Sequence, residues 1–164
     1  MVVQLNIALA DNRTTYYSGE WVRGIAQIQT DTLVPVVELH FYGEAKCHWT
    51  VTRGTKENRQ RYRLSSYEPI TQWQNALTNQ GQPFQPGSYQ VPFELQLPLA
   101  IPSSMEGQYG FIRYFVSIQI PGGDGLFGIL SGGNSRAFQK IKILRVIDTN
   151  LPQFLVFIYL KFIF

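Results

Sequence analysis

Two segments between Pro86 and Ile120 alternate apolar and polar residues with the period of a β-strand. The apolar positions of the first segment are Val91, Phe93, Leu95 and Leu97. Those of the second segment are Ile112, Tyr114, Val116, Ile118 and Ile120. Successive side chains of a strand point to opposite faces, so each segment has one face suited to a core. The sequence therefore predicts two strands. Pro92 cannot donate to a ladder and belongs at an edge, a strand start or a bulge.

The longest alternating segment covers residues 37–51. Its apolar face carries Val37, Leu39, Phe41, Ala45, Cys47, Trp49 and Val51, and its other face carries Glu38, His40, Tyr42, Glu44, Lys46, His48 and Thr50. At ~3.3 Å per residue such a strand spans about 50 Å, so Gly43 in its middle is predicted to be a bend or bulge. The pattern also predicts that Trp49 and the Cys47 thiol point into the core.

Further strands are predicted towards both ends of the chain. Residues 3–9 alternate, and the turn at 11–13 indicates a hairpin with the strand that begins at Thr15. A last strand is predicted over residues 138–147. Residues 53–86 are rich in polar and turn residues, which predicts a functional loop, a mobile loop or an edge strand without clear limits.

Together these segments predict an all-β protein. Turn residues separate the strands at regular spacing, which is typical of an antiparallel β-sandwich of the immunoglobulin-like type. The chain has 164 residues and is long enough to bury one substantial core. The predicted core consists of Leu39, Phe41, Trp49, Phe93, Leu95, Tyr114, Val116 and Ile118.

Cysteine content and charge indicate the environment of the chain. The single cysteine, Cys47, cannot form an internal disulfide, and no signal-peptide pattern precedes the first strand. We therefore expect a reducing, intracellular compartment. The formal net charge of +3 is too small a bias to indicate a nucleic-acid partner.

Two patterns imitate enzyme sites. Residues 123–128 have a GxGxxG spacing with Asp148 twenty residues further on, but the Gly-rich residues after them do not favour the helix that would hold a pyrophosphate. Cys47 and His48 are neighbours on one strand and point to opposite faces, so they cannot act as nucleophile and base. A nucleotide-binding enzyme is the least favoured interpretation, and the sequence predicts no catalytic residue, cofactor or metal site.

Basic residues supply the candidate binding positions. One set is Arg53, Lys56, Arg59, Arg61 and Arg63, and a second, more scattered set includes Lys140 and Lys142. Because Arg59, Arg61 and Arg63 alternate, in a strand they form one cationic stripe that can bind phosphate or carboxylate groups. The alternative is that the stripe only protects a solvated edge strand from pairing with other chains.

Small motifs follow one another in a defined order along the chain. They include Ser18-Gly19-Glu20, Gly43-Glu44-Ala45, Pro86-Gly87, Pro92-Phe93, Leu97-Pro98, Pro102-Ser103-Ser104, Glu106-Gly107 and Ile112-Arg113-Tyr114. In this order they resemble the N-terminal domain of arrestin-like proteins, in particular the arrestin domain-containing (alpha-arrestin) branch. The resemblance covers residues 1–150.

The resemblance implies a non-catalytic adaptor for the intracellular trafficking of membrane proteins. Its expected partners are membrane-protein cargo tails and the trafficking machinery. Its expected location is the cytoplasm, including the cytoplasmic surface of the plasma membrane or endosomes. The chain lacks the Pro-Pro-x-Tyr motif with which members of this branch recruit WW-domain ligases. An alternative function is a β-sandwich module that binds anionic lipid headgroups or acidic peptides through residues 53–63.

The composition changes abruptly at residues 151–164. These residues are almost continuously bulky and apolar, with Lys161 among them. Fourteen residues are too few for a transmembrane helix, which needs ~20. We therefore expect a tail outside the domain that is not native arrestin sequence, with the composition of an aggregation-prone segment.

Overall fold

The computed structural model describes residues 2–55, 58–79, 81–121 and 136–147. In these residues the elements are β1 (Val3–Leu9), the 3-10 turn η1 (Ala10–Asn12), β2 (Thr15–Tyr17), β3 (Trp21–Thr30), β4 (Val37–Arg53), β5 (Gln60–Leu77), β6 (Gly87–Gln96), β7 (Met105–Glu106), β8 (Gly110–Gln119) and β9 (Arg136–Leu144). The predicted tail, Lys56, the GxGxxG residues and Asp148 lie outside the described residues.

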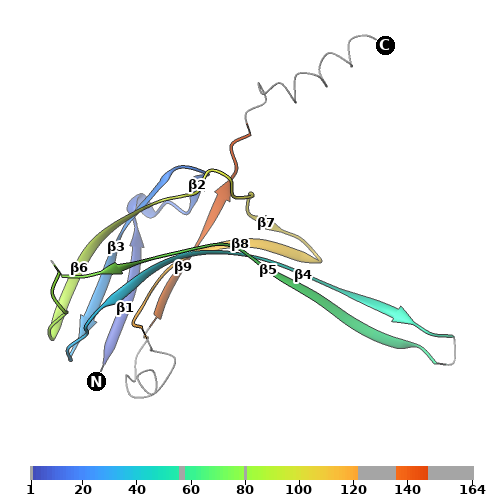
Figure 1. Cartoon of the computed structure of the whole chain (residues 1–164), viewed down its shortest axis with the longest axis horizontal. Coiled ribbons are helices and arrows are strands. Elements are labelled where there is room, and N and C mark those ends of the chain that lie inside the picture. The colour runs from blue at the N-terminus through green and yellow to red at the C-terminus, as the bar shows by residue number, and fades with distance from the viewer. Residues whose placement is uncertain (1, 56–57, 80, 122–135, 148–164) are drawn as a thin grey trace, which may run out of the picture.

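The strands form two sheets that pack face to face (Figure 1). The smaller sheet has the order β1-β3-β6, and the larger has the order β2-β9-β8-β4-β5 with β7 added beside β8. This arrangement confirms the predicted β-sandwich. The strict antiparallel prediction is wrong at one pair, because the short β2 runs parallel to β9.

The core lies between the two sheets and contains the inward side chains of both. Seven of the eight predicted core residues are buried: Leu39, Phe41, Phe93, Leu95, Tyr114, Val116 and Ile118. Trp49 is the exception, since it is 42% exposed, and Cys47 is exposed as well. Both residues occupy the inward face of β4, at the point where β4 leaves the body of the sandwich (Figure 1). Among the described strands, the smaller sheet covers this face at Phe41 and does not reach Trp49.

The β4–β5 ribbon extends beyond the body of the sandwich (Figure 1). We call residues 47–66 the arm, of which 47–55 and 58–66 are described. From His48 onwards, the only described strand that pairs with β4 is β5, for example Trp49 with Leu64 and Thr52 with Arg61. Of the three alternatives predicted for residues 53–86, the structure supports the edge strand, because the 18-residue β5 occupies much of this segment at the edge of its sheet.

Two backbone predictions are confirmed. The β4–β5 register shifts between Gly43 and Glu44, so the irregularity lies at the predicted glycine, with the extra residue, Ile70, on the β5 side. β6 is an edge strand, so Pro92 removes no ladder bond from the middle of the sheet. The predicted hairpin at residues 11–13 is wrong, because β1 pairs with β3 and the chain then crosses to the other sheet, where β2 pairs with β9.

Candidate interaction surface

The arm has two chemically different faces. Directly paired residues of adjacent strands lie on the same face, and successive residues alternate between faces. The outer face, which points away from the smaller sheet, therefore carries Thr50 with Arg63 and Thr52 with Arg61. The inner face carries Trp49 with Leu64, Val51 with Tyr62, and Arg53 with Gln60.

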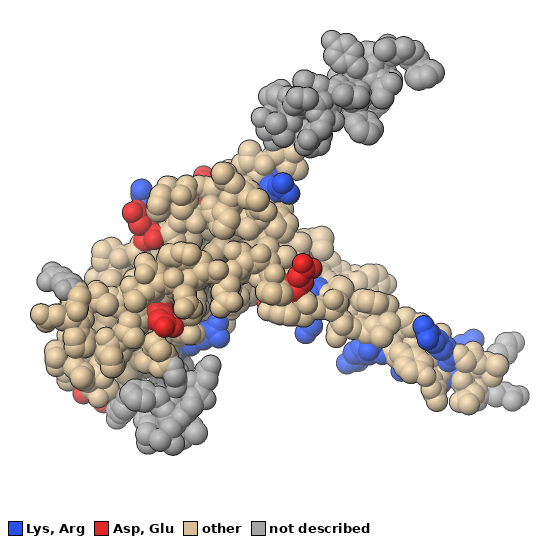
Figure 2. All heavy atoms as spheres, in the orientation of Figure 1, with Lys and Arg blue, Asp and Glu red and all other residues tan. Residues whose placement is uncertain are grey.

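The arginines of the outer face lie close together and exposed. Arg61 and Arg63 occupy alternate positions of β5, and Arg59 lies just before that strand near the tip. Among the described residues, no acidic side chain forms an ion pair with any of these three arginines. Figure 2 shows blue cationic side chains along the arm. The stripe is thus available to an anionic partner.

The same face continues over the body of the large sheet. β4 keeps its alternation past the bulge, so Tyr42, Lys46 and Thr50 share one face. Phe115 pairs with Tyr42 on one side and with Lys140 on the other, which places Lys140 and Lys142 on that face too. Strand order thus places on one face two basic sets that are about 80 residues apart in the sequence. They are not adjacent on that face, because Lys140 is level with Tyr42 and Arg63 with Thr50, about 26 Å further along β4.

The predicted binding residues therefore divide into three groups. Arg61, Arg63, Lys140 and Lys142 share the outer face of the large sheet, and Arg59 lies at the arm tip. Arg53 is on the opposite face, because it pairs with Gln60. Lys56 is outside the described residues. Binding of a partner or an anion by these residues stays a prediction.

Glu106 neutralises part of this positive surface. Its carboxylate accepts bonds from the Arg113 guanidinium at 2.8 and 2.9 Å and from the Lys140 ammonium at 2.5 Å. These two hydrogen-bonded cations, Arg113 first, lower the pKa of Glu106 to about 2. Lys140 is therefore already paired. Through these bonds Glu106 also links the short β7 to β8, with which it pairs, and to β9.

We expect the Glu106 ion-pair cluster to resist acid. The depressed pKa means that the interaction is complete above the ordinary pKa of 4.5 and is lost only as the pH falls through about 2. A carbon-detected NMR titration of the side-chain carboxyls should place the Glu106 midpoint near 2. A midpoint near 4.5 would mean that the cluster does not form in solution, and Glu106→Gln provides the assignment control.

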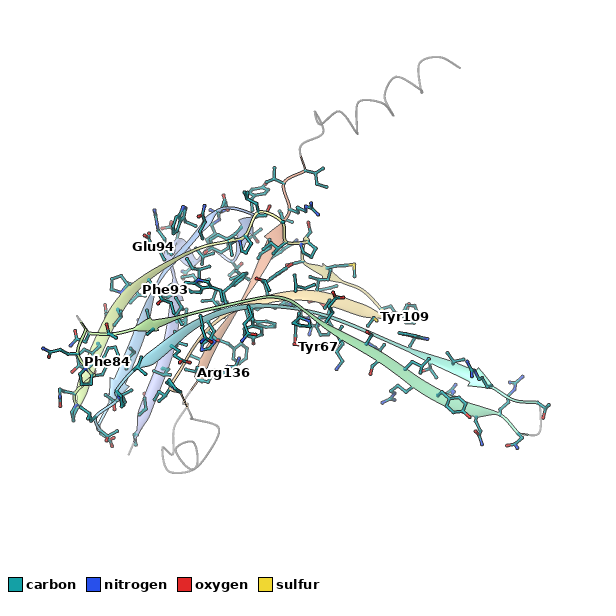
Figure 3. The ribbon with its side chains drawn as sticks, in the orientation of Figure 1. Tyr67, Phe84, Phe93, Glu94, Tyr109 and Arg136 are labelled. Atoms are coloured by element: carbon teal, nitrogen blue, oxygen red, sulfur yellow. The ribbon has the colours of Figure 1, made fainter. Side chains whose placement is uncertain are left out.

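An aromatic cluster accompanies the cations on the outer face. The Tyr42 and Phe115 rings stack with centroids 5.1 Å apart, and Phe138 meets Phe115 edge-on at 6.2 Å. The Arg136 guanidinium lies 5.6 Å from the centre of the Tyr42 ring and donates to its hydroxyl at 3.3 Å. Arg136 and Tyr67, labelled in Figure 3, line one shallow depression with Tyr42 on this side of the sheet.

Sequence reasoning missed this aromatic cluster. The available signal was the pair Tyr42 and Phe115, which fall on the polar faces of two strongly alternating strands. Aromatic residues at such positions indicate an exposed apolar patch rather than a core. The pairing of β4 with β8 was needed to show that the two rings touch.

Side chains that commonly bind metals or act as nucleophiles are dispersed over the described residues. They contain no group of three or more His, Cys, Asp or Glu side chains that could hold a metal ion. Cys47 and His48 lie on opposite faces of β4, as predicted. In the described part of the chain, no helix has both the length and the apolar character needed to cross a membrane.

Comparisons with known proteins agree with this geometry. "Arrestin domain-containing protein 17" of Caenorhabditis elegans is 29% identical over 109 residues, which cover 60% of this chain. The match spans only 26% of the length of the worm protein. The solved structure of Spo0M, a sporulation control protein from Bacillus subtilis, shares the fold with a TM-score of 0.52 at 16% identity. That alignment covers 90% of this chain and 51% of Spo0M.

The family comparison covers nearly the whole sandwich. Residues 5–150 match the family described as "Arrestin (or S-antigen), N-terminal domain". This range contains all the strands described above except the first two residues of β1. The chain therefore belongs to the arrestin family and contains that family's N-terminal domain.

Proposed function

We propose that this protein is a non-catalytic adaptor for the intracellular trafficking of membrane proteins. The observation that carries the proposal is the row of exposed arginines on the outer face of the arm, with which no acidic side chain of the described residues forms an ion pair. Family membership supports an adaptor in general. The proposed site of action is the cytoplasm, at the cytoplasmic surface of the plasma membrane or endosomes.

The proposed partners are acidic cytoplasmic segments of membrane-protein cargo. Arginine presents a planar fork of donors that matches a carboxylate or phosphate with two parallel hydrogen bonds. Arg61 and Arg63 lie two positions apart on one face, about 6 to 7 Å along the strand, which suits successive acidic groups of an extended peptide. A concentrated positive surface also accelerates the encounter with an acidic partner.

Reversing the charge of Arg59, Arg61 and Arg63 together should weaken binding to acidic peptides. Because the interaction is exposed, the loss should be large at low salt and should shrink as ionic strength rises. The thermal unfolding midpoint should hardly change, since these side chains contact no acidic group within the described structure. Fluorescence anisotropy with a labelled acidic peptide measures the effect. The titration is done at about 50 mM and about 300 mM salt, which lie below and above the physiological ionic strength.

A single pair of variants provides the matched control for that experiment. Arg23→Glu reverses an exposed arginine on the smaller sheet, whereas Arg63→Glu makes the same change on the arm. Only Arg63→Glu should weaken peptide binding. Equal effects of the two variants would mean that net charge matters and the outer face does not.

Proximity labelling in cells tests the adaptor function itself. The full chain should label integral membrane proteins and trafficking factors, and the triple charge-reversal variant should lose that enrichment. If the wild type and the variant label the same proteins, the outer face does not recruit these partners. An absence of membrane proteins from both labelled sets would overturn the adaptor function.

A further inference from the structure

The inner face of the arm is apolar and uncovered. Trp49, Tyr62 and Leu64 are 42%, 46% and 41% exposed, and Val51 lies between them half-buried. On the body of the sandwich this face of β4 is covered by the smaller sheet, but the arm extends beyond it (Figure 1). Large apolar side chains on neighbouring strands form a contiguous patch, which is typical of an interaction surface.

The arm also concentrates the positive charge of the protein. Residues 47–66 contain five lysines and arginines and one glutamate, so their net charge is +4. Since the whole chain has a net charge of +3, all other residues together carry −1. In the described part of the arm there is no acidic side chain. One slender element thus combines an apolar face with a local excess of positive charge.

We propose that the arm binds the surface of an anionic phospholipid bilayer, with its apolar face turned towards the acyl chains. Tryptophan and tyrosine favour the boundary between headgroups and hydrocarbon, where the ring is buried and its polar group stays hydrated. Lysine and arginine near an anionic surface each strengthen the attachment, and their long side chains reach the phosphates from the opposite face. Arg53 extends the apolar face with a cation near the tip.

Other occupants of the arm satisfy only part of these features. A second copy would cover the apolar face but would bring two arms of charge +4 together. An acidic peptide would neutralise the arginines of the outer face but would leave Trp49, Tyr62 and Leu64 in water. An anionic bilayer provides both an apolar interior for the uncovered side chains and negative charge for the arginines. The observations therefore favour it.

The backbone limits how deeply the arm can insert. Both edges of the two-stranded arm carry backbone groups without a strand partner, because β8 ends opposite Cys47 and β5 is the edge of its sheet. Unpaired N–H and C=O groups cannot enter the hydrocarbon core without a large cost in free energy. The arm therefore lies in the headgroup region, at a depth of about 5 to 10 Å like other interfacial segments, and does not span the membrane.

This inference does not depend on the proposed cargo. It requires only that the arm meets a membrane, and purified protein with synthetic vesicles tests it. The adaptor function is tested in cells, so either proposal can fail while the other stands.

Vesicle flotation with the full chain provides the first test. The probes are phosphatidylcholine vesicles with and without phosphatidylserine, together with an acidic peptide as competitor. Wild type should float with the anionic vesicles and much less with the neutral ones. Arg61→Gln/Arg63→Gln should weaken the partition coefficient about 30-fold, because each cation near an anionic surface contributes about fivefold.

The apolar face has its own variant and a matched control. Trp49→Ser/Leu64→Ser should weaken binding to the anionic vesicles by at least about tenfold. Trp21→Ser should have no effect, although Trp21 is 48% exposed, because it lies on the smaller sheet. Circular dichroism confirms that all variants stay folded. If Trp49→Ser/Leu64→Ser binds like wild type, the apolar face does not meet the bilayer and the inference is overturned.

Fluorescence of Trp49 provides the second readout. In the full chain with Trp21→Phe and Trp73→Phe, Trp49 is the remaining tryptophan. Its emission should shift to the blue on addition of anionic vesicles, and lipids brominated near the headgroup should quench it. The acidic peptide should not produce this shift. An unchanged emission with vesicles, or an equal shift with the peptide, would assign the arm to peptide binding instead.

Discussion

Replacing Phe93 with alanine should lower the free energy of unfolding by about 3 to 5 kcal/mol. Phe93 is 7% exposed on the edge strand β6, opposite Gly24 of β3. Its ring fills the space that Gly24 leaves, since a β-carbon at Gly24 would lie 2.7 Å from the ring tip. Removal of the ring therefore leaves a cavity beside a residue that has no side chain to close it.

Chemical denaturation followed by circular dichroism measures the effect of Phe93→Ala. Phe138→Ala is the matched control, because Phe138 is 65% exposed on the outer face of β9 and its loss creates no internal cavity. Its cost should stay below about 1 kcal/mol. If both phenylalanines cost the same, Phe93 does not belong to the core of the sandwich.

Gly43→Ala should destabilise the protein by about 1 to 3 kcal/mol or more through overpacking. A β-carbon at Gly43 would lie 2.4 Å from the Tyr114 ring. That ring cannot easily move, because it is fully buried, stacked on Phe41 at 6.0 Å, and held by a 2.7 Å hydrogen bond from its hydroxyl to the Pro102 carbonyl. The glycine is thus required by a close contact at the bulge.

A double-mutant cycle isolates this contact. Tyr114→Leu alone removes the hydrogen bond and part of the buried ring, and it should be destabilising in its own right. In the Tyr114→Leu background, however, the added methyl group of Gly43→Ala should cost much less than in wild type, because the ring atoms it meets are gone. Additive costs in denaturant melts would show that the penalty comes from the backbone of the bulge and not from Tyr114.

The pairing of Glu106 with Lys140 changes how the outer face is interpreted. Both Lys140 and Arg113 are bound to one carboxylate, which stays ionised at any pH above about 2. They therefore contribute less to a positive surface than their number suggests. The unpaired cations of the described outer face are concentrated on the arm, which is why its arginines are the preferred sites for mutation.

Strand periodicity predicted the sandwich but could not show where the smaller sheet stops covering the inward face of β4. Alternation over residues 37–51 correctly placed Trp49 on the same face as Phe41. A strand pattern states which side chains share a face, and only the partner sheet decides whether that face is dry. Since the smaller sheet covers only the body of the sandwich and the arm extends beyond it (Figure 1), the same face is core at Phe41 and exposed at Trp49.

The limits of strand β5 could not be predicted for a related reason. Most of its residues are exposed on both faces of the ribbon. Because neither face is buried, the sequence between Gln60 and Leu77 does not need to alternate apolar and polar residues. Its length is stabilised by the backbone ladder with β4, which extends over the whole of both strands. A ladder of main-chain hydrogen bonds is difficult to predict from the sequence, because every residue other than proline can form it.

The sequence by itself determined the class of fold, most of the core, the bulge at Gly43 and the order of motifs that resembles the arrestin N-terminal domain. All of these depend on local rules: alternation, turn chemistry and the special geometry of glycine and proline. Tertiary structure alone decided that Arg61, Arg63, Lys140 and Lys142 share one face, and that Trp49, Tyr62 and Leu64 form an uncovered one. The physical reason is that strand order and the ends of neighbouring strands set these surfaces, and both result from contacts between residues far apart in the chain.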